Sequence, residues 1–442
     1  MWEKAIVIGG GFAGKLAAKA LSSYFQQVNI LEADREYKDP VPRKRIPQSY
    51  QPHVLLKSGE EAIEKLFPQF TVELLEKGSI GSNFTRDLKW HHFDFWKDRF
   101  KGDLNMVQQS RPMLEWQLQK RIDKVSNITI RYETMVNQLI INRKENKILG
   151  VRIKSFKTGM EEELYADLVV DASGFGSKSI DWLKAYGLEV KEEKVWIQLF
   201  YATRLYRLKK QERLDWTNLL ISPSFPENHN GAFIQTIEEN RFSVTISGYA
   251  NESAPQTNEE FIAYAQSLPV PDLINFLYKA EPISDIKIHK IPYQVRRRFD
   301  LAKQIPEGFL VIGDAHCRFD PLFGQGISVA ALEALELQSF LQQTTRLDTG
   351  FTRRFHKKIA KLIATPWDMA ITEAFRHPNI KGKNSILLQF KLWYTKRVYQ
   401  ASAHDPFIYT RLARVMNLIR TPLHLFHPKV VIPIVFGWKK KV

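Results

Sequence analysis

The 442-residue chain has a single cysteine, Cys317, which excludes an intramolecular disulfide framework and a thiolate metal cluster. It also lacks a membrane-spanning hydrophobic run, since the apolar stretch VVIPIVFGW falls short of the roughly 20 residues that a spanning helix needs. The opening residues EKAIVIGGGFAGK are interrupted by glycines, unlike a signal peptide. We therefore expect a cytoplasmic protein without a bound metal, in which Cys317 packs as a small buried side chain.

Acidic residues are fewer than basic ones, with 48 Asp and Glu against 64 Lys and Arg, for a net charge of +16. Such an excess favours phosphates, anionic lipid or nucleic acid as partners. The sequence has no recognisable helix-turn-helix, zinc-finger or RNA-binding signature, so we expect no nucleic-acid partner. The C-terminal HLFHPKVVIPIVFGWKKKV would either contact an anionic membrane peripherally or pack on the protein. Its prolines favour packing, because they interrupt a continuous amphipathic helix.

The first motif, KAIVIGGGFAGKLAAKAL, is typical of a strand, a glycine turn and a helix. Gly9, Gly11 and Gly14 occupy the G-x-G-x-x-G positions, which permit a tight turn, the approach of a pyrophosphate and close packing of helix on strand. A second strand, QVNILEAD, ends near Glu32, where a carboxylate would bind the adenosine ribose of a dinucleotide. This pattern predicts binding of FAD or NAD.

A later segment, EGFLVIGDAHCRFDPLFGQGISVAALEALEL, distinguishes these two cofactors. It predicts a buried strand, a loop and a helix that begins near Gly326. Asp314 at the strand end can accept hydrogen bonds from a ribityl chain, and Pro321 would stiffen the loop. Gly324 and Gly326 would expose amides at a helix N-terminus, which suits an electron-rich flavin edge. NAD has no ribityl chain, so the pair of motifs predicts FAD.

Together these motifs resemble those of flavoprotein monooxygenases of the aromatic-hydroxylase type. The resemblance implies that Arg111, in SRPMLEWQL, reaches the flavin phosphates, and that ADLVVDASGFGSKS is the middle motif of the family. The predicted cofactor-binding residues are Gly9, Gly11, Gly14, Glu32, Arg45, Arg111, Asp171, Gly174, Gly313, Asp314, Pro321, Gly324, Gly326 and Ile327.

A narrower resemblance links RIPQSYQPHVLLKSGEEAIEKLFP and TPWDMAITEAFRHP to a branch that contains bacterial polyether epoxidases. The chain departs from this branch at Asp320, where Asn is frequent, and at Phe323, where Tyr is more common. These departures would alter the pocket beside the flavin without affecting the fold. We expect His316, Pro321 and Phe323 beside the flavin, but the sequence assigns no catalytic residue.

The resemblance implies an FAD-dependent monooxygenase that activates O2 as a flavin C4a-hydroperoxide. It would epoxidise or hydroxylate an apolar small molecule, in secondary metabolism. Electrons would come from NAD(P)H or, as reduced flavin, from a partner reductase, because the chain has only one G-x-G-x-x-G. The cluster of Arg43, Lys44 and Arg45 would meet a nicotinamide phosphate or remain solvated, and the second interpretation is favoured.

Three alternative functions remain open at this stage. They are a flavin-dependent reductase or dehydrogenase of a polyprenyl-like substrate, a flavin-dependent halogenase, and a non-catalytic flavin-binding module. The halogenase is disfavoured, because the W-x-W-x-I-P segment usual in such enzymes is missing.

The predicted fold is α/β, a Rossmann-like FAD-binding domain with an inserted antiparallel-sheet substrate domain and a C-terminal helical region. The FAD-binding domain would comprise residues 1–75, 105–180 and 300–345, the substrate domain 76–104 and 181–299, and the helical region 346–442. Segments of alternating polarity, such as VWIQLFYATRLYR and RFSVTISGY, indicate the antiparallel sheet.

Overall fold

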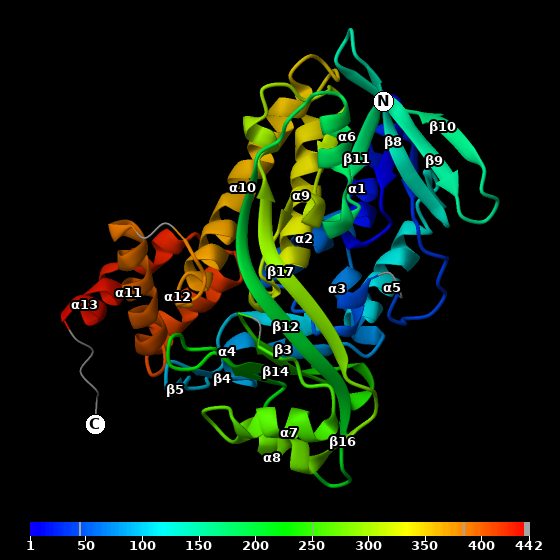
Figure 1. The fold of residues 1–442 in the computed structure, drawn as a ribbon. Coiled ribbons are helices and arrows are strands. Elements are labelled where there is room, and N and C mark those ends of the chain that lie inside the picture. The colour runs from blue at the N-terminus through cyan, green and yellow to red at the C-terminus, as the bar shows by residue number, and fades with distance from the viewer. Residues whose placement is uncertain (44–45, 251, 383–384, 437–442) are drawn as a thin grey trace.

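The computed structural model describes residues 1–43, 46–250, 252–382 and 385–436, and these form a mixed α/β fold, as predicted (Figure 1). A parallel sheet of five strands lies at its N-terminal end. The strands, in sheet order, are β18 (Phe309–Val311), β11 (Leu168–Asp171), β1 (Trp2–Ile8), β2 (Phe25–Leu31) and β7 (Ile128–Arg131). Both faces of β1 are covered, which explains its continuous apolar run: Val7 packs into one core cluster and Ile6 into another.

One face of the parallel sheet is covered by helices. These are α1 (Phe12–Ser22), α2 (Lys57–Leu66), α3 (Phe70–Glu76), α5 (Arg111–Ile122) and α9 (Gln325–Gln342), with α10 (Phe351–Ala374) beyond them. Small residues such as Ala17 and Ala334 are fully buried in this cluster, so α1 and α9 can approach closely. The other face is covered by an antiparallel sheet of β8 (Thr134–Asn142), β9 (Lys147–Ser155) and β10 (Glu161–Tyr165), with α6 (Ser179–Ala185).

A nine-stranded sheet forms the second half of the molecule. Its strands are β19 (Cys317–Arg318), β17 (Lys287–Arg297), β12 (Glu192–Leu208), β15 (Arg241–Gly248), β14 (Gly231–Ile237), β13 (Asn218–Ile221), β4 (Leu88–His92) and β5 (Phe95–Trp96), with β16 (Ala280–Pro282) paired to β12. All pairs are antiparallel except β13 with β4. Strands β12 and β17 run along much of the molecule (Figure 1). Strand β19 belongs to this sheet although it lies in the segment 300–345, which was predicted to be FAD-binding.

Shorter elements complete this half. Helices α7 (Asn258–Gln266) and α8 (Asp272–Lys279) pack with the nine-stranded sheet in one core cluster. A separate pair, β3 (Ile80–Asn83) and β6 (Asn105–Gln108), leads into and out of α4 (Phe84–Asp87) and β4.

The C-terminal helices lie to one side of both sheets (Figure 1). They are α11 (Ile386–Ala401), α12 (Pro406–Met416), the 3-10 turn η7 (Pro422–Phe426) and α13 (Pro428–Phe436). Trp90 of β4 packs among them, which joins this region to the nine-stranded sheet. Within the ranges given above, no helix combines the length and the apolar character needed to cross a bilayer.

Candidate cofactor and substrate site

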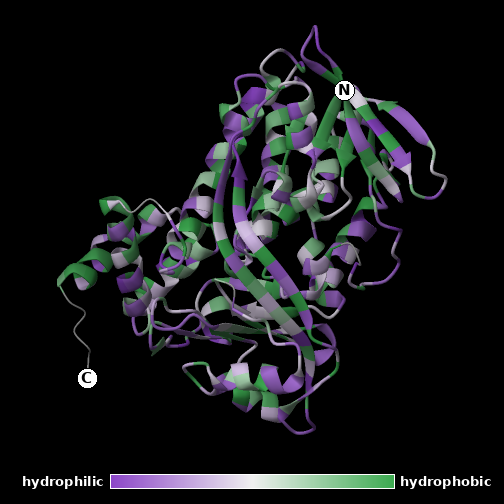
Figure 2. Ribbon diagram, in the orientation of Figure 1, coloured by the Kyte–Doolittle hydropathy of each residue, from purple (hydrophilic) through white to green (hydrophobic). Residues whose placement is uncertain are grey.

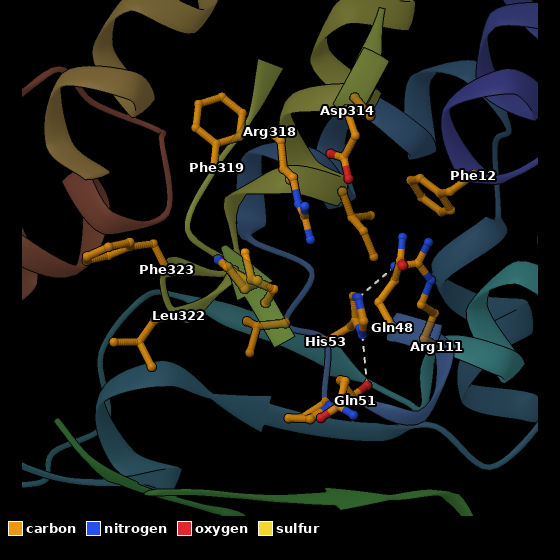
Figure 3. Close-up of a pocket in the computed structure, with 18 of the residues that line it drawn as sticks. Phe12, Gln48, Gln51, His53, Arg111, Asp314, Arg318, Phe319, Leu322 and Phe323 are labelled. Carbon is orange, nitrogen blue, oxygen red and sulfur yellow. Dashed lines mark hydrogen bonds between the residues drawn. The ribbon is translucent and has the colours of Figure 1, made fainter. Parts of the chain in front are cut away.

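A cavity of about 760 Å³ lies between the parallel sheet and the nine-stranded sheet (Figure 3). Its wall includes Gly9, Gly11, Glu32 and Arg111 from one half of the molecule, and residues of β13, β14 and β15 from the other. A volume of this size is within the range of small-molecule and cofactor sites. The cavity therefore connects the predicted cofactor motifs to the antiparallel sheet.

The glycine turn between β1 and α1 brings the helix close to the strand and leaves room for a ligand beside it. Gly9 has a φ of +94°, a region that favours glycine, and a Cβ on Gly14 would lie only 1.9 Å from the carbonyl oxygen of Gly9. Beside Gly11, by contrast, the nearest atom to an added Cβ is a guanidinium nitrogen of Arg43, at 3.7 Å. Among the residues that the structure describes, no side chain caps the N-terminus of α1, so its first amides are available to an anion such as a pyrophosphate.

Glu32, directly after β2, accepts hydrogen bonds from three donors, one of them the backbone N–H of Asp34, which donates to Oε1 at 2.8 Å. Its Oε2 atom accepts hydrogen bonds from the backbone N–H of Gly10, at 2.8 Å, and from Nη1 of Arg43, at 3.3 Å. The Arg43 guanidinium also donates through Nε to Oε2 of Glu115, at 3.1 Å. Arg43 is thus buried between two carboxylates. The prediction that Arg43 is solvated is therefore wrong, because its ion pairs with Glu32 and Glu115 hold it inside the protein. Arg45, a predicted cofactor-binding residue, lies outside the described residues.

Arg111 is the first residue of α5, where Ser110 caps the helix by accepting a hydrogen bond from the backbone of Met113. Its Nε donates to Glu115 at 2.7 Å and its Nη1 lies 2.7 Å from Nε2 of His53 (Figure 3). Burial and the charge of Arg111 lower the pKa of His53 to about 3, so the ring is neutral. Its Nδ1 then donates to the carbonyl of Gln51 at 2.8 Å. These contacts fix a guanidinium at the cavity wall, where it suits a phosphate.

The acid between Arg111 and Arg43 completes this arrangement. Burial alone would favour neutral Glu115, but the charges of Arg111, Arg43 and Lys15 lower its pKa to about 2. Lys15 of α1 is itself buried, and its desolvation and the charge of Arg43 lower its pKa to about 7. The sequence motif predicts neither residue.

Asp314 enters the cavity from the turn that follows β18 (Figure 3). Among the residues that the structure describes, none donates a hydrogen bond to its carboxylate, and burial raises its pKa. A Cβ on Gly326 would lie 3.7 Å from Oδ1 of Asp314, so the helix start stays open beside it. A half-buried carboxylate that accepts no hydrogen bond from the described residues can accept them from a ligand, and the hydroxyls of a ribityl chain fit this role.

The loop after Asp314 supplies the neighbouring wall. Pro321, Phe323, Gly324, Gly326 and Ile327 all line the cavity. Gly324 has a φ of +62° and is the N-cap of α9, so a glycine is needed there.

Asp320, one of the departures noted in the sequence, is fully buried and holds this loop. It accepts hydrogen bonds from the backbone of Leu322 at 2.9 Å and from the hydroxyl of Tyr249 at 2.7 Å. Burial raises the pKa of Asp320 to about 6. Tyr249 lines the cavity, and this pair therefore places a phenol on the wall beside the loop.

Four predicted site residues do not line the cavity. His316 is buried against Phe299 and His356, with Nδ1 3.4 Å from a carboxylate oxygen of Glu333, because the turn after β18 directs its ring toward α10. Its predicted place beside the flavin is therefore wrong.

Asp171, Gly14 and Gly313 are the other three, and they shape the wall from behind it. Asp171 accepts hydrogen bonds from the hydroxyls of Ser173 and Ser177, both at 2.6 Å. It thereby orders the loop that carries Gly174, which does line the cavity. Gly313 has a φ of +62°, and a Cβ there would lie 2.9 Å from Cβ of Ala13.

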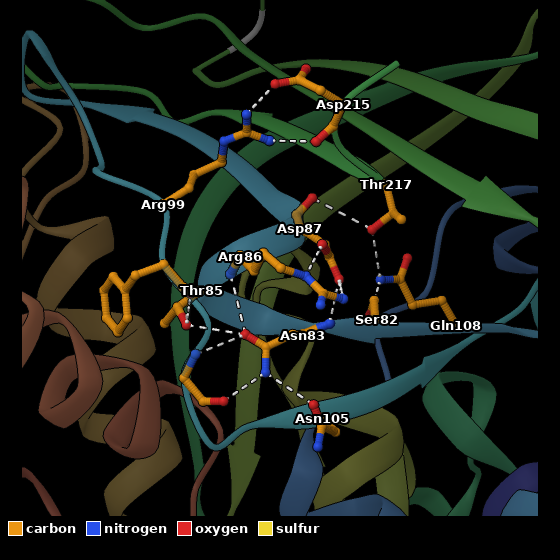
Figure 4. Close-up of polar contacts among 12 residues, drawn as sticks. Ser82, Asn83, Thr85, Arg86, Asp87, Arg99, Asn105, Gln108, Asp215 and Thr217 are labelled. Carbon is orange, nitrogen blue, oxygen red and sulfur yellow. Dashed lines mark hydrogen bonds and ion pairs between the residues drawn. The ribbon is translucent and has the colours of Figure 1, made fainter. Parts of the chain in front are cut away.

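Polar side chains on the antiparallel half form the other end of the cavity. Gln108 of β6, Asn218 of β13 and Gln235 of β14 line it, and Asn218 lies directly opposite Gln235 in the strand pair. Each has a buried amide oxygen that accepts no hydrogen bond within the described part of the chain. The amide nitrogen of Gln108 is held by Ser82 and Thr217 (Figure 4), and that of Gln235 by the carbonyl of His53 at 3.1 Å. Three unpaired acceptor oxygens thus lie in the wall at this end of the cavity, covered by neighbouring atoms.

Arg318 is a further wall residue that the sequence did not single out. Its guanidinium lies 3.8 Å from the centre of the Phe175 ring, and Nη1 has no hydrogen-bond partner among the described residues. Burial lowers its pKa, and Asp314 opposes that effect. Figure 3 shows Arg318 and Asp314 extending into the same cavity.

The fold, with the glycine turn after β1 and the Asp314 turn after β18, has the architecture of FAD-type flavoproteins. Comparison with solved structures gives the same fold. Flavin-dependent brominase Bmp2 superposes with a TM-score of 0.67 at 15% identity, covering 93% of this chain and 92% of that one. Solved structures with the same fold also include a flavin-dependent halogenase and a probable FAD-dependent monooxygenase. At such low identity the likeness concerns the fold.

Sequence comparison adds two curated relatives. The chain is 27% identical over 377 residues to Protein Rv3254 of Mycobacterium tuberculosis (strain ATCC 25618 / H37Rv), covering 83% of this chain and 79% of that protein. It is 24% identical over 357 residues to kynurenine 3-monooxygenase of Drosophila willistoni, covering 77% and 72%. No family model matches the chain. The narrower resemblance to polyether epoxidases stays a prediction.

Proposed function

We propose that this protein is an FAD-dependent monooxygenase that epoxidises or hydroxylates a small, largely apolar molecule. One observation carries the proposal: a single cavity joins the glycine turn, Arg111 and Asp314 to a pocket on the nine-stranded sheet. Such a cavity allows a bound flavin and a substrate to meet in one enclosed space. The likeness to kynurenine 3-monooxygenase and to FAD-dependent folds supports the same function.

Bound FAD would supply the activation of O2, and the chain's own residues would hold and orient the reactants. The amides at the start of α1 and the Arg111 guanidinium would bind the pyrophosphate, Glu32 the ribose and Asp314 the ribityl hydroxyls. The walls around Pro321 and Phe323 would exclude water from the reacting face. Tyr249, whose hydroxyl proton is directed to Asp320, would offer its phenol oxygen as an acceptor to a substrate hydroxyl.

The lining of the pocket specifies the substrate further. Its apolar wall includes Trp90, Leu220, Phe225 and Met416. Beside this wall, the free oxygens of Gln108, Asn218 and Gln235 require donors such as O–H or N–H groups. We infer a substrate with an apolar, ring-containing body and at least one neutral hydrogen-bond donor at one end.

A flavin-dependent halogenase is the second candidate, favoured by the structural likeness to brominase Bmp2. The absent W-x-W-x-I-P segment still counts against it. Halide dependence separates the two functions, because only halogenation consumes bromide or chloride.

The test is stopped-flow spectroscopy of the photoreduced holoprotein mixed with oxygenated buffer, with and without bromide. A transient absorbance distinct from the oxidised and reduced cofactor is expected, with rates independent of bromide. Single-phase reoxidation, also with a panel of phenols, anilines and alkenes, would contradict oxygen transfer and favour a reductase or dehydrogenase. A bromide-dependent change with brominated phenol as product would identify a halogenase. NADH and NADPH consumption, with and without an added flavin reductase, would then identify the electron donor.

A further inference from the structure

Positive charge is concentrated at the C-terminal end of the chain. Residues 376–442 contain thirteen Lys and Arg but one acid, Asp405, and so carry +12 of the total charge of +16. The preceding 375 residues are close to balanced, at +4. Some of these cations pair with acids from the rest of the chain, as Lys391 does with Asp368 and Arg414 with Asp103. The remaining excess of positive charge attracts anions over about a Debye length.

The same region exposes large apolar side chains. Ile386 of α11 is 92% exposed, Leu423 of η7 is 76% exposed and Phe436 of α13 is 82% exposed. Figure 2 shows hydrophobic residues on α11 and α13 at the outer side of the molecule. We call this surface the docking face, made by the exposed residues Ile386, Leu387, Phe390, Trp393, Leu423, Phe426, Ile432, Val435 and Phe436.

Packing contacts join the elements of the docking face. The ring of Tyr394 stacks on Phe426 with centroids 4.7 Å apart and on Phe390 with centroids 5.8 Å apart, which links α11 to η7. Helix α13 contacts both α11 and η7. The exposed side chains therefore belong to one packed unit and are not scattered over separate loops.

Basic side chains are interleaved with this unit. The guanidinium of Arg411 lies 4.6 Å and Nζ of Lys429 5.6 Å from the centre of the Phe407 ring. Arg411 also donates to the carbonyl of His424 at 2.9 Å. Besides partial burial, the charges of Arg411, Arg414 and Arg420 lower the pKa of His424, which reports a local excess of positive charge.

The helices behind the docking face also reach the cavity. Arg376, Tyr399 of α11 and Met416 of α12 line it. The elements that carry the docking face therefore also contribute to the cavity wall.

We propose that the docking face binds the surface of an anionic lipid bilayer, with its apolar side chains in the headgroup region and its Lys and Arg on lipid phosphates. Exposed apolar residues together with cationic ones are what interfacial binding requires. A second copy of the chain is a poor occupant, because residues 376–442 carry a net charge of +12 and two such segments would repel each other. Binding at the interface would give the enzyme access to apolar substrates dissolved in the membrane, and it does not depend on which reaction the site performs.

The experiment is co-sedimentation of the full-length holoprotein with vesicles of phosphatidylcholine, with or without phosphatidylglycerol. Binding to the anionic vesicles should be at least about tenfold tighter and should weaken as salt is added, because several cations act together. Equal binding to both kinds of vesicle, or to neither, would overturn the proposal.

A matched pair of variants locates the surface. Leu423→Ser with Ile432→Ser should reduce binding to anionic vesicles by about tenfold, since two apolar side chains that would enter the headgroup region are lost. Met160→Ser with Leu301→Ser, which alters exposed apolar residues elsewhere, should leave it unchanged. Equal losses in both would overturn the assignment, as would size-exclusion evidence of a dimer that only the first pair dissociates. If the protein bound polyglutamate but did not bind anionic vesicles, an acidic protein would be indicated as the partner.

Discussion

The cofactor site and the docking face would each bind an anion, but the first is rigid and buried, whereas the second is exposed and loosely constrained. At the cofactor end, backbone amides, a buried Arg111 and bonded carboxylates leave little freedom, and a single Cβ on Gly14 would collide with its neighbour. At the docking face, exposed Leu423 and Phe436 stand among basic residues without such constraints. The first arrangement can select one molecule by geometry, whereas the second responds to charge and apolar area. Substitutions should therefore have sharp effects at one end and graded effects at the other.

The largest effect is expected for Gly14→Ala. Its Cβ would lie 1.9 Å from the carbonyl oxygen of Gly9, so the turn must open and the pyrophosphate site is lost. The purified variant should carry almost no FAD, measured by its absorbance after denaturation, and should still bind anionic vesicles. Gly81→Ala, where the nearest atom would be 3.8 Å away, is the control and should retain FAD. Full FAD content in Gly14→Ala would contradict the assigned turn.

A smaller effect is expected for Asp314→Ala, because it removes hydrogen-bond acceptors without moving the backbone. Affinity for FAD should fall by roughly 10- to 100-fold, corresponding to about 1.5–3 kcal/mol. The apoprotein should become slightly more stable, because a half-buried carboxylate without a donor among the described residues is removed. Isothermal titration with FAD and thermal unfolding of the apoprotein measure these two opposite changes. Asp348→Ala, at an exposed site, should alter neither, and a destabilised apoprotein with unchanged affinity would refute the role.

The smallest effect on FAD and vesicle binding is expected at the junction between the nine-stranded sheet and α11, where only stability should change. The ammonium group of Lys97, next to β5, donates to the carbonyl of Tyr399 and to the hydroxyl of Ser402, and burial lowers its pKa to about 7. The unfolded lysine binds its proton below pH 10.5 and the folded one only below about 7, so stability rises with pH across this interval. Lys97→Met should remove a slope of up to about 1.4 kcal/mol per pH unit.

Urea unfolding of this variant near pH 7 and near pH 10 measures that slope. Lys124→Met, on an exposed side chain, is the control. An unchanged slope in Lys97→Met would mean that Lys97 is protonated in the folded protein. FAD content and vesicle binding should stay normal in both variants, which would show that Lys97 affects stability without affecting the cofactor site or the docking face.

The fold class and much of the cofactor site were predictable, because positions with a restricted backbone admit few residue types and so can be recognised in the sequence. A glycine is required wherever φ is positive or a Cβ would collide, and Gly9, Gly14 and Gly324 meet one of these conditions. The burial of Cys317 was also predicted correctly. Asp314 follows a strand, so its place at the sheet edge follows from the topology.

The substrate end was not predictable for the opposite reason. Whether Gln235 or its neighbour faces the cavity depends on the register of β14 on β13, and a one-residue shift would reverse the choice. Tyr249 lies outside any motif, and His53 lies in the segment RIPQSYQPHVLLKSGEEAIEKLFP, which predicted no role for it, so only tertiary contacts bring them to the wall. The solvation predicted for Arg43 failed similarly, because Glu115 is far away in sequence. The docking face depends on which residues packing leaves exposed.

The order of strands in the parallel sheet also has a consequence for biosynthesis. Strands β1 and β2 are made first, whereas β18 and the Asp314 turn that complete the site come after every strand of the inserted sheet except β19. At about 5–20 residues per second, a ribosome needs roughly 15–60 s to travel from Glu32 to Asp314. During that time the nascent chain holds half of a flavin site. If the chain binds FAD as proposed, FAD would bind only late in folding, and the yield of holoprotein would depend on the supply of FAD as translation ends.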